Sequence, residues 1–250
     1  KYGRIAQGAD LLISGDIPQG AGLSSSASLE VCFGKLISEL NALNLELTEL
    51  AAFGQAAEAF AGIKCGIMDQ MISACGEEGH ALLIDCQTLH LQQVPLPEQF
   101  VVMVINSNVK HQLVGSEYNE RRQCCEQAAK ALGVRVLREA TLSDLEAAKA
   151  QLDEVTFKRA RHVITENERV LEAVDALAQG DLQRLATLMY ASHCSMRDDF
   201  EITIPEIHAL VEIIRNALGD KAGAVRMTGG GFGGSVVALV RRGNEELVRK

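Results

Sequence analysis

A glycine-rich loop that runs into a cluster of serines constrains the fold of this chain more than any other segment. The loop spans residues 15–22 and holds three glycines and a proline, and Leu23-Ser24-Ser25-Ser26 follows it directly. We expect a short strand over 9–14 before the loop. A helix over about 25–42 is predicted after it, because apolar residues recur there at helical spacing.

This arrangement favours a phosphate-binding site. Glycine lets a backbone approach a ligand closely, and a helix N-terminus presents unpaired N–H groups at the positive end of its dipole. The alternative is a loop followed by one serine that caps the helix. Capping requires one serine, and three follow the glycines here. The loop is not a Walker A motif, because no lysine follows its last glycine.

Composition narrows the class of ligand. The 250-residue chain has a net charge of −9, which argues against a nucleic-acid or anionic-membrane partner. The cysteine count of seven is odd and no pair has C-x-x-C spacing, so we expect reduced thiols and a cytoplasmic setting. The apolar runs are too short to cross a bilayer.

The sequence opens at Lys1 without a methionine or signal peptide and stops within a predicted helix, which suggests a fragment.

The remaining pattern predicts an α+β fold, because helices and strands mix without regular alternation. Thr48 is the expected N-cap of a second helix, and Thr141 with Asp144 resembles a capping box. Helices are predicted from Thr48 through 57, near 67–72 and over 117–132, 141–152, 157–178, 181–196 and 205–218. Strands are predicted over 81–86, 101–106, 224–227 and 235–240.

Two carboxylates stand out in the first third of the chain. Asp69 lies in the segment Cys65-Gly66-Ile67-Met68-Asp69-Gln70, where a lone aspartate is ordinarily a first-turn helix residue. Glu58 precedes it by eleven positions, and its ordinary interpretation is a solvated helix glutamate. The residues alone favour the structural interpretation of Asp69 over a catalytic one.

A second glycine string covers 229–234 and contains a literal G-x-G-x-x-G. A dinucleotide site requires a helix after that motif, whereas 235–240 reads as a strand, so a glycine hairpin is expected. The six histidines form no metal-binding pair, and each is interpreted as a surface or capping residue.

The segment P-x-G-A-G-L-S-S-S-A-S at 18–28 resembles the second motif of the GHMP kinases, in the form found in galactokinases. C-G-I-M-D-Q at 65–70 is similar to the segment that carries their catalytic aspartate, and 226–234 is similar to their third motif. Residues 106–108 with 115–119, and Met196-Arg197-Asp198-Asp199-Phe200-Glu201, also resemble the family, and we assign no chemistry to the latter. The resemblance implies a two-domain α+β fold with the active-site cleft between domains 1–76 and 77–250.

The resemblance also implies residue roles. Asp69 is the implied catalytic base, and the galactose contacts are Gly66, Asp69 and Tyr118. The ATP phosphates are implied to lie against Gly20, Ala21, Gly22, Leu23, Ser24, Ser25 and Ser26. Ser26 and Glu58 are the implied Mg²⁺ ligands. The chain is about one residue shorter than the family pattern after Glu58, so Ala57 and Glu58 could exchange register.

The family's first motif, G-R-x-N-L-I-G-E-H-x-D-Y, has no counterpart in this sequence. The implied activity is phosphoryl transfer from ATP to the 1-hydroxyl of galactose, and we expect little turnover without that motif. A kinase for a related sugar such as N-acetylgalactosamine, and a galactose- and ATP-sensing regulator without turnover, remain alternatives. The oligomeric state is open.

Overall fold

The computed structural model describes residues 8–19, 22–62, 65–109 and 115–249, and it confirms the α+β class. The chain divides into two compact units, Lys1–Pro95 and Leu96–Lys250. The predicted division into 1–76 and 77–250 concerns the family's domains and stays a prediction.

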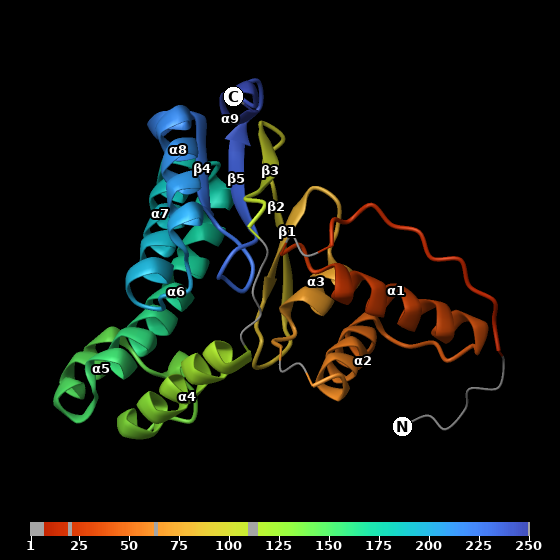
Figure 1. The fold of residues 1–250 in the computed structure, drawn as a ribbon, viewed down its shortest axis with the longest axis horizontal. Helices are drawn as coiled ribbons and strands as arrows, with labels where there is room; N and C mark the ends of the chain where they lie inside the picture. The colour runs from red at the N-terminus through yellow and green to blue at the C-terminus, as the bar shows by residue number, and fades with distance from the viewer. Residues whose placement is uncertain (1–7, 20–21, 63–64, 110–114, 250) are drawn as a thin grey trace. The chain divides into compact units, whose positions relative to one another are not determined.

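The first unit is built from helices that pack on one another and a hairpin (Figure 1). Leu50, Ala51 and Met71 lie at its centre with at most 1% of their surface exposed. Strands β1 and β2 pair antiparallel, from His80 opposite Pro95 to Ile84 opposite Leu91. The elements are α1 (Ser25–Leu40), α2 (Leu47–Phe60), α3 (Met68–Cys75), β1 (His80–Ile84) and β2 (Leu91–Pro95).

Two expectations for the first unit are wrong, and one strand was not predicted. Residues 9–14 form no strand, because no described residue pairs with them, and Leu12 is 97% exposed. Helix α2 begins one residue before Thr48, and its N-cap position is Glu46, whose amide donates to the Glu49 carboxylate. Strand β2 was not predicted, since its sequence LQQVP carries two glutamines and a proline.

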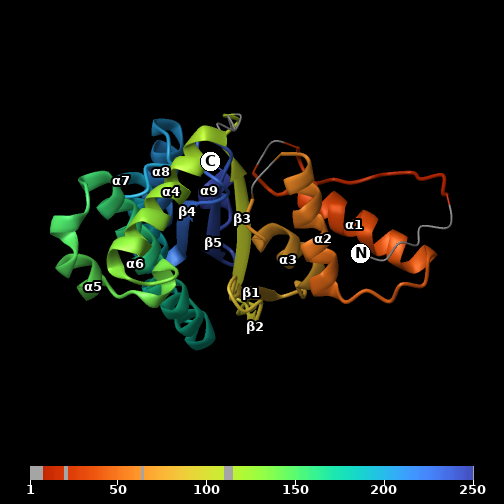
Figure 2. The ribbon, with the colours of Figure 1, turned by 90° about the horizontal axis from the view of Figure 1, so that it is seen from below.

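The second unit is organised on an antiparallel sheet with strand order β3-β5-β4. The strands are β3 (Phe100–Asn106), β4 (Gly223–Met227) and β5 (Ser235–Arg241). Strands β4 and β5 form the predicted hairpin, in which Met227 pairs with Val236 across the glycine-rich turn. Helices α7 and α8 pack on the sheet, and α6 lies against α7 (Figures 1 and 2).

The helices of this unit follow the predicted pattern within a few residues at most ends. The predicted helix 141–152 is instead a short helix followed by a 3₁₀ turn, and Thr141 and Asp144 form the expected capping box. Gly180 ends α6 in the left-handed conformation, which glycine adopts without steric cost. The helices are α4 (Gly115–Leu132), α5 (Leu142–Ala147), α6 (Glu154–Gln179), α7 (Leu182–Asp198), α8 (Pro205–Ala222, interrupted at Gly219) and α9 (Glu246–Arg249), with 3₁₀ turns at Leu137–Glu139 and Lys149–Gln151.

The structure also bears on the cysteines and on helix hydropathy. None of the seven cysteines, all of which lie in the described ranges, forms a disulfide. None of the helices in the described ranges combines the length and apolar character that crossing a membrane requires.

Candidate functional site

The serine cluster lies at the start of α1. Gly20 and Ala21 fall outside the described residues, and Gly22 adopts a left-handed conformation with φ 71°. Ser24 occupies the N-cap position, also with positive φ, and its side chain makes no capping hydrogen bond. The interpretation of this serine as a side-chain cap is therefore wrong.

The hydroxyl groups around this helix start are accessible. Leu23, Ser24 and Ser25 are half-buried, and Ser26 is exposed. The first amides of a helix have no intrahelical carbonyl to bind, and the helix dipole makes this end positive. The first turn of α1 contains no acidic residue that would oppose an anion. Serine hydroxyls and helix-start amides are thus present together at the N-terminal end of α1, and their role in binding phosphate stays a prediction.

Asp69 lies in the first turn of α3, two positions from each of the buried residues Ile67 and Met71. Its carboxylate is half-buried and makes no hydrogen bond or ion pair with any described residue. Gly66 is exposed just before the helix, and a β-carbon built on it meets no atom within 4 Å. Both residues therefore present groups that a ligand could contact.

Glu58 belongs to a buried polar cluster of α1, α2 and α3. It is 8% exposed, whereas its neighbour Ala57 is exposed. The interpretation of Glu58 as a solvated helix glutamate is therefore wrong, and in this structure Glu58 rather than Ala57 faces inward. Glu30 lies beside Glu58, and Gln70 Nε2 donates to Glu30 Oε2 at 3.1 Å.

Electrostatics in this cluster are unfavourable for two ionised carboxylates. Burial raises the pKa of Glu30 above its ordinary value, and the contact with Glu58 raises it further, although the Gln70 hydrogen bond acts in the opposite direction. Gly54 allows this close packing, because a β-carbon there would lie 3.0 Å from Gln70 Cγ and 3.1 Å from Glu30 Oε2. Glu30 and Glu58 thus lie close together because Gly54 lets α1, α2 and α3 pack tightly.

Sequence reasoning did not identify Glu30. The available signal is its spacing from Ser26, because residues four apart lie on the same face of a helix. That spacing alone does not reveal that α2 brings Glu58 to the same face.

The polar cluster fits the chemistry of Mg²⁺. This ion prefers oxygen ligands and is usually held by one or two carboxylates together with substrate phosphates. Glu58 and Glu30 supply carboxylate oxygens, and a cation would relieve the repulsion that raises the pKa of Glu30. The part of the chain that the structure describes has no group of three or more His, Cys, Asp or Glu residues arranged as a metal site.

In the second unit, the segments singled out by the sequence surround the turn between β4 and β5. Tyr118 lies in the first turns of α4, and its side chain falls outside the described set. The carbonyl of Gly234 accepts a 2.6 Å hydrogen bond from Ser107 Oγ, which anchors the turn to the end of β3. Strand β5 follows the G-x-G-x-x-G string, as expected for a hairpin rather than a dinucleotide site.

Two histidines do not match the prediction of surface or capping positions. His162 is 8% exposed and His193 is fully buried. Burial lowers the pKa of each imidazole to about 4. Both are neutral core residues near pH 7.

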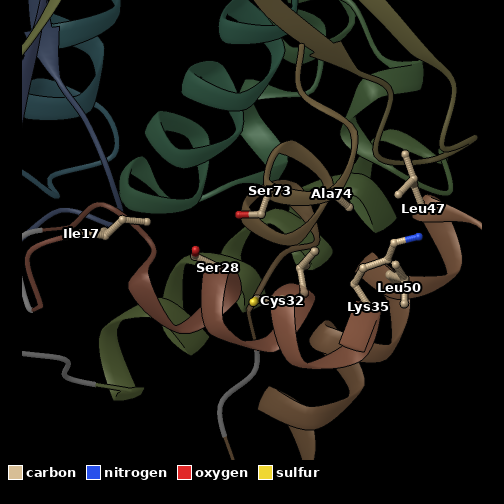
Figure 3. A pocket seen from close by; sticks show the side chains of 9 residues that line it. Ile17, Ser28, Cys32, Lys35, Leu47, Leu50, Ser73 and Ala74 are labelled. Carbon is tan, nitrogen blue, oxygen red and sulfur yellow. The ribbon is translucent and has the colours of Figure 1, made fainter. Parts of the chain in front are cut away.

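A cavity of about 490 Å³ is lined by residues of α1, α2 and α3 and by Ile17 of the first unit (Figure 3). Its walls are mostly apolar, with Ser28, Cys32, Lys35 and Ser73 as the polar or sulfur-bearing side chains. None of the predicted site residues lines it. The cavity therefore gives no support to the roles assigned above.

Comparison with known proteins shows the family to which the chain belongs. The model of the GHMP kinases N-terminal domain matches residues 1–77, and that of the GHMP kinases C-terminal domain matches 173–250. The structure of Lactococcus lactis galactokinase complexed with galactose is 35% identical to this chain, with a TM-score of 0.87. The match covers 94% of this chain and 62% of that protein, so the chain spans less than two thirds of its length.

More distant structures share the fold. L. major mevalonate kinase in complex with R-mevalonate is 22% identical with a TM-score of 0.59, over 90% of this chain and 60% of that one. Streptococcus pneumoniae phosphomevalonate kinase in complex with phosphomevalonate and AMPPNP is 15% identical with a TM-score of 0.61. That match covers 90% of this chain and 63% of that one. The two domain models cover more than half of the chain, and it belongs to the GHMP kinase family.

Proposed function

We propose that this chain carries the phosphoryl-transfer site of a galactokinase, which moves the γ-phosphoryl group of ATP to the 1-hydroxyl of galactose. The observation that carries the proposal is the 35% identity to Lactococcus lactis galactokinase complexed with galactose, over 94% of this chain. The mevalonate-pathway enzymes match at lower identity and support the fold alone.

Asp69 is the proposed general base. Its carboxylate has no partner among the described residues, so it is available to accept the proton of the sugar hydroxyl. The sugar oxygen forms a bond to the γ-phosphorus, the bond from that phosphorus to the β–γ bridging oxygen breaks, and ADP leaves. Gly66 and Tyr118 are proposed to contact the sugar, and the open space around Gly66 leaves its backbone accessible.

The start of α1 is proposed to hold the ATP phosphates. Residues 20–26 provide backbone N–H groups and serine hydroxyls, and the uncapped Ser24 side chain is free of a structural hydrogen bond at this helix end. Ser26 and Glu58 would hold Mg²⁺, with Glu30 nearby. The ion would neutralise phosphate charge as the transferring group develops it.

An ADP-release assay with several sugars tests the proposal. ADP formation that depends on galactose is expected in the active enzyme that contains this sequence. Faster turnover with N-acetylgalactosamine would assign the site to a related sugar. Saturable binding of galactose and ATP without ADP formation would identify a sensor and contradict the kinase proposal.

A further inference from the structure

The turn that follows α7 holds the glycine-rich turn of the second unit in place. This turn, residues 199–202, comprises the last three residues of the M-R-D-D-F-E segment, to which the sequence assigns no chemistry, and Ile202 after it. The backbone amides of this turn bind the end of α7. The amides of Asp199 and Phe200 both donate to the Ser195 carbonyl at 3.0 Å. Its carbonyl groups therefore face other partners.

Two buried arginines bind three of those carbonyls in succession. Arg159 of α6, 2% exposed, donates to the carbonyl of Asp199, and also to the Glu201 carboxylate at 2.7 Å. Arg121 of α4, 8% exposed, donates from Nε to the carbonyl of Phe200 at 3.0 Å. Its Nη2 donates to the carbonyl of Glu201 at 2.9 Å. A guanidinium group can bridge two carbonyls in this way, whereas a lysine ammonium cannot reproduce the same rigid fork.

The fourth carbonyl of the turn binds the glycine-rich motif. The amide of Phe232 donates to the carbonyl of Ile202 at 2.7 Å. Gly231 lies against the same residue, and the Arg121 guanidinium lies 5.8 Å from the centre of the Phe232 ring. Arg121 therefore contacts both sides of the junction between the two turns.

We propose that Arg121 is a positioning residue, which fixes the glycine turn 229–234 by holding the carbonyls of Phe200 and Glu201. Arg121 lies one helical turn after Tyr118, so the same contacts link the start of α4 to the glycine turn. The expected effect of Arg121 on turnover rests on the proposed function, in which the glycine turn shapes the substrate cleft. The expected effect of Arg121 on the conformation of the glycine turn does not rest on the proposed function.

Hydrogen exchange measured by mass spectrometry on the 250-residue chain tests the conformational step. In Arg121→Lys, we expect the amides of 228–234 to exchange about tenfold faster or more, while α8 and β5 exchange at wild-type rates. The matched control is Arg122→Lys on the same helix, whose exposed side chain pairs with Glu126. Unchanged exchange over 228–234 would overturn the proposal, as would an equal increase across the whole unit.

Kinetics of the active enzyme that contains this sequence test the positioning role. We expect Arg121→Lys to lower kcat by about 10- to 100-fold with KM for ATP and sugar within about threefold, because small misplacements in a site act on the transition state. Wild-type kcat with altered exchange would overturn the catalytic consequence. Altered exchange in a protein without any kinase activity would contradict the proposed function and leave the positioning of the turn standing.

Discussion

Gly231 lies so close to Ile202 that a β-carbon added to the glycine would stand 2.4 Å from the Ile202 carbonyl oxygen. The same glycine has a φ of +89°, a conformation that other residues rarely adopt. Backbone packing therefore requires a glycine at position 231, whether or not the turn contacts a ligand.

Gly231→Ala should lower the free energy of unfolding by about 3 kcal/mol or more, because backbone strain and a steric clash act together. Gly243→Ala is the matched control. Gly243 has a φ of +94°, and a β-carbon there meets nothing within 4 Å. That variant should lose only about 1–2 kcal/mol from strain. Urea unfolding measures the free energy of unfolding of both variants. Equal losses would show that the close approach of Gly231 to Ile202 does not affect stability.

Asp69→Asn should remove most activity and leave the fold and ATP binding nearly unchanged. Asparagine matches the shape of aspartate and cannot accept the hydroxyl proton. General-base catalysis contributes about 10²–10⁴-fold, and a loose phosphoryl transition state favours the lower part of that range. If Asp69 only interacts favourably with the dipole of α3, the variant should lose a few tenths of a kcal/mol in its free energy of unfolding and keep its kcat.

Measurement of kcat and melting temperature on one preparation separates the two roles of Asp69. Glu77→Gln, at an exposed position shortly after α3, controls for the loss of one negative charge. A kcat for Asp69→Asn within about threefold of wild type is too small a loss for a general base, and it would return Asp69 to a structural role.

Ser26→Ala should weaken the use of Mg²⁺ and ATP far more than galactose binding. Its exposed hydroxyl is the proposed metal ligand, and alanine maintains the helix. Ser28→Ala is the control, because Ser28 lies on the same helix and lines the cavity of Figure 3. Titration of activity with Mg²⁺ at fixed ATP should shift for the first variant alone. An identical Mg²⁺ dependence in both would exclude Ser26 as a ligand.

The sequence predicted the elements whose signals are local. Helix α1 and the β4–β5 hairpin follow from helical periodicity and from a glycine string between two apolar runs. The strand expected at 9–14 failed, because a strand needs a partner and no described residue pairs with it. Burial of Glu58 and the approach of Glu30 were also beyond prediction, since they depend on Gly54 allowing α1, α2 and α3 to pack closely.

The arginine contacts to the turn after α7 also could not be predicted from the sequence. Arg121 and Arg159 lie about 80 and 40 residues from the carbonyls that they bind. Backbone carbonyls leave no signature in a sequence, so the M-R-D-D-F-E segment was noticed only by resemblance. Its role in supporting the glycine turn became visible only through the tertiary contacts.

The buried imidazole of His162 should make the second unit sensitive to acid. Its pKa is about 4 in the folded state, mainly because of burial, against an ordinary value near 6.5. The unfolded chain therefore binds a proton more readily, and stability falls as pH drops from about 6.5 towards 4. The contribution to the slope is at most about 1.4 kcal/mol per pH unit.

Substitution of this histidine tests the slope. His162→Gln loses the stacking on Phe200, so it should be less stable than wild type at pH 7. Its stability should nevertheless decline less steeply between pH 6.5 and 4, as measured by urea unfolding at several pH values. Parallel curves for His162→Gln and wild type would mean that His162 does not titrate in this window.

The carboxylate pair in the first unit predicts the opposite pH dependence. The pKa of Glu30 is raised in the folded state, first by burial and then by its contact with Glu58. The folded state thus holds the Glu30 proton more tightly than the unfolded chain does. Stability from this group is fully present below the unfolded pKa near 4.5 and is lost as pH rises through the folded value.

Glu30→Gln should therefore be more stable than wild type at neutral pH. Glutamine does not titrate, and its carbonyl oxygen can still accept the hydrogen bond from Gln70 Nε2. Because solvent reaches the half-buried Glu30 and screens its repulsion from Glu58, we expect a rise in melting temperature of about 2 °C at pH 7.5 that vanishes near pH 4. Glu39→Gln is the control on the same helix, where an exposed glutamate pairs with Lys35 at 2.6 Å. That variant should be slightly less stable than wild type at pH 7.5. A melting temperature for Glu30→Gln equal to or below that of wild type at pH 7.5 would mean that Glu30 and Glu58 do not repel each other in the folded protein.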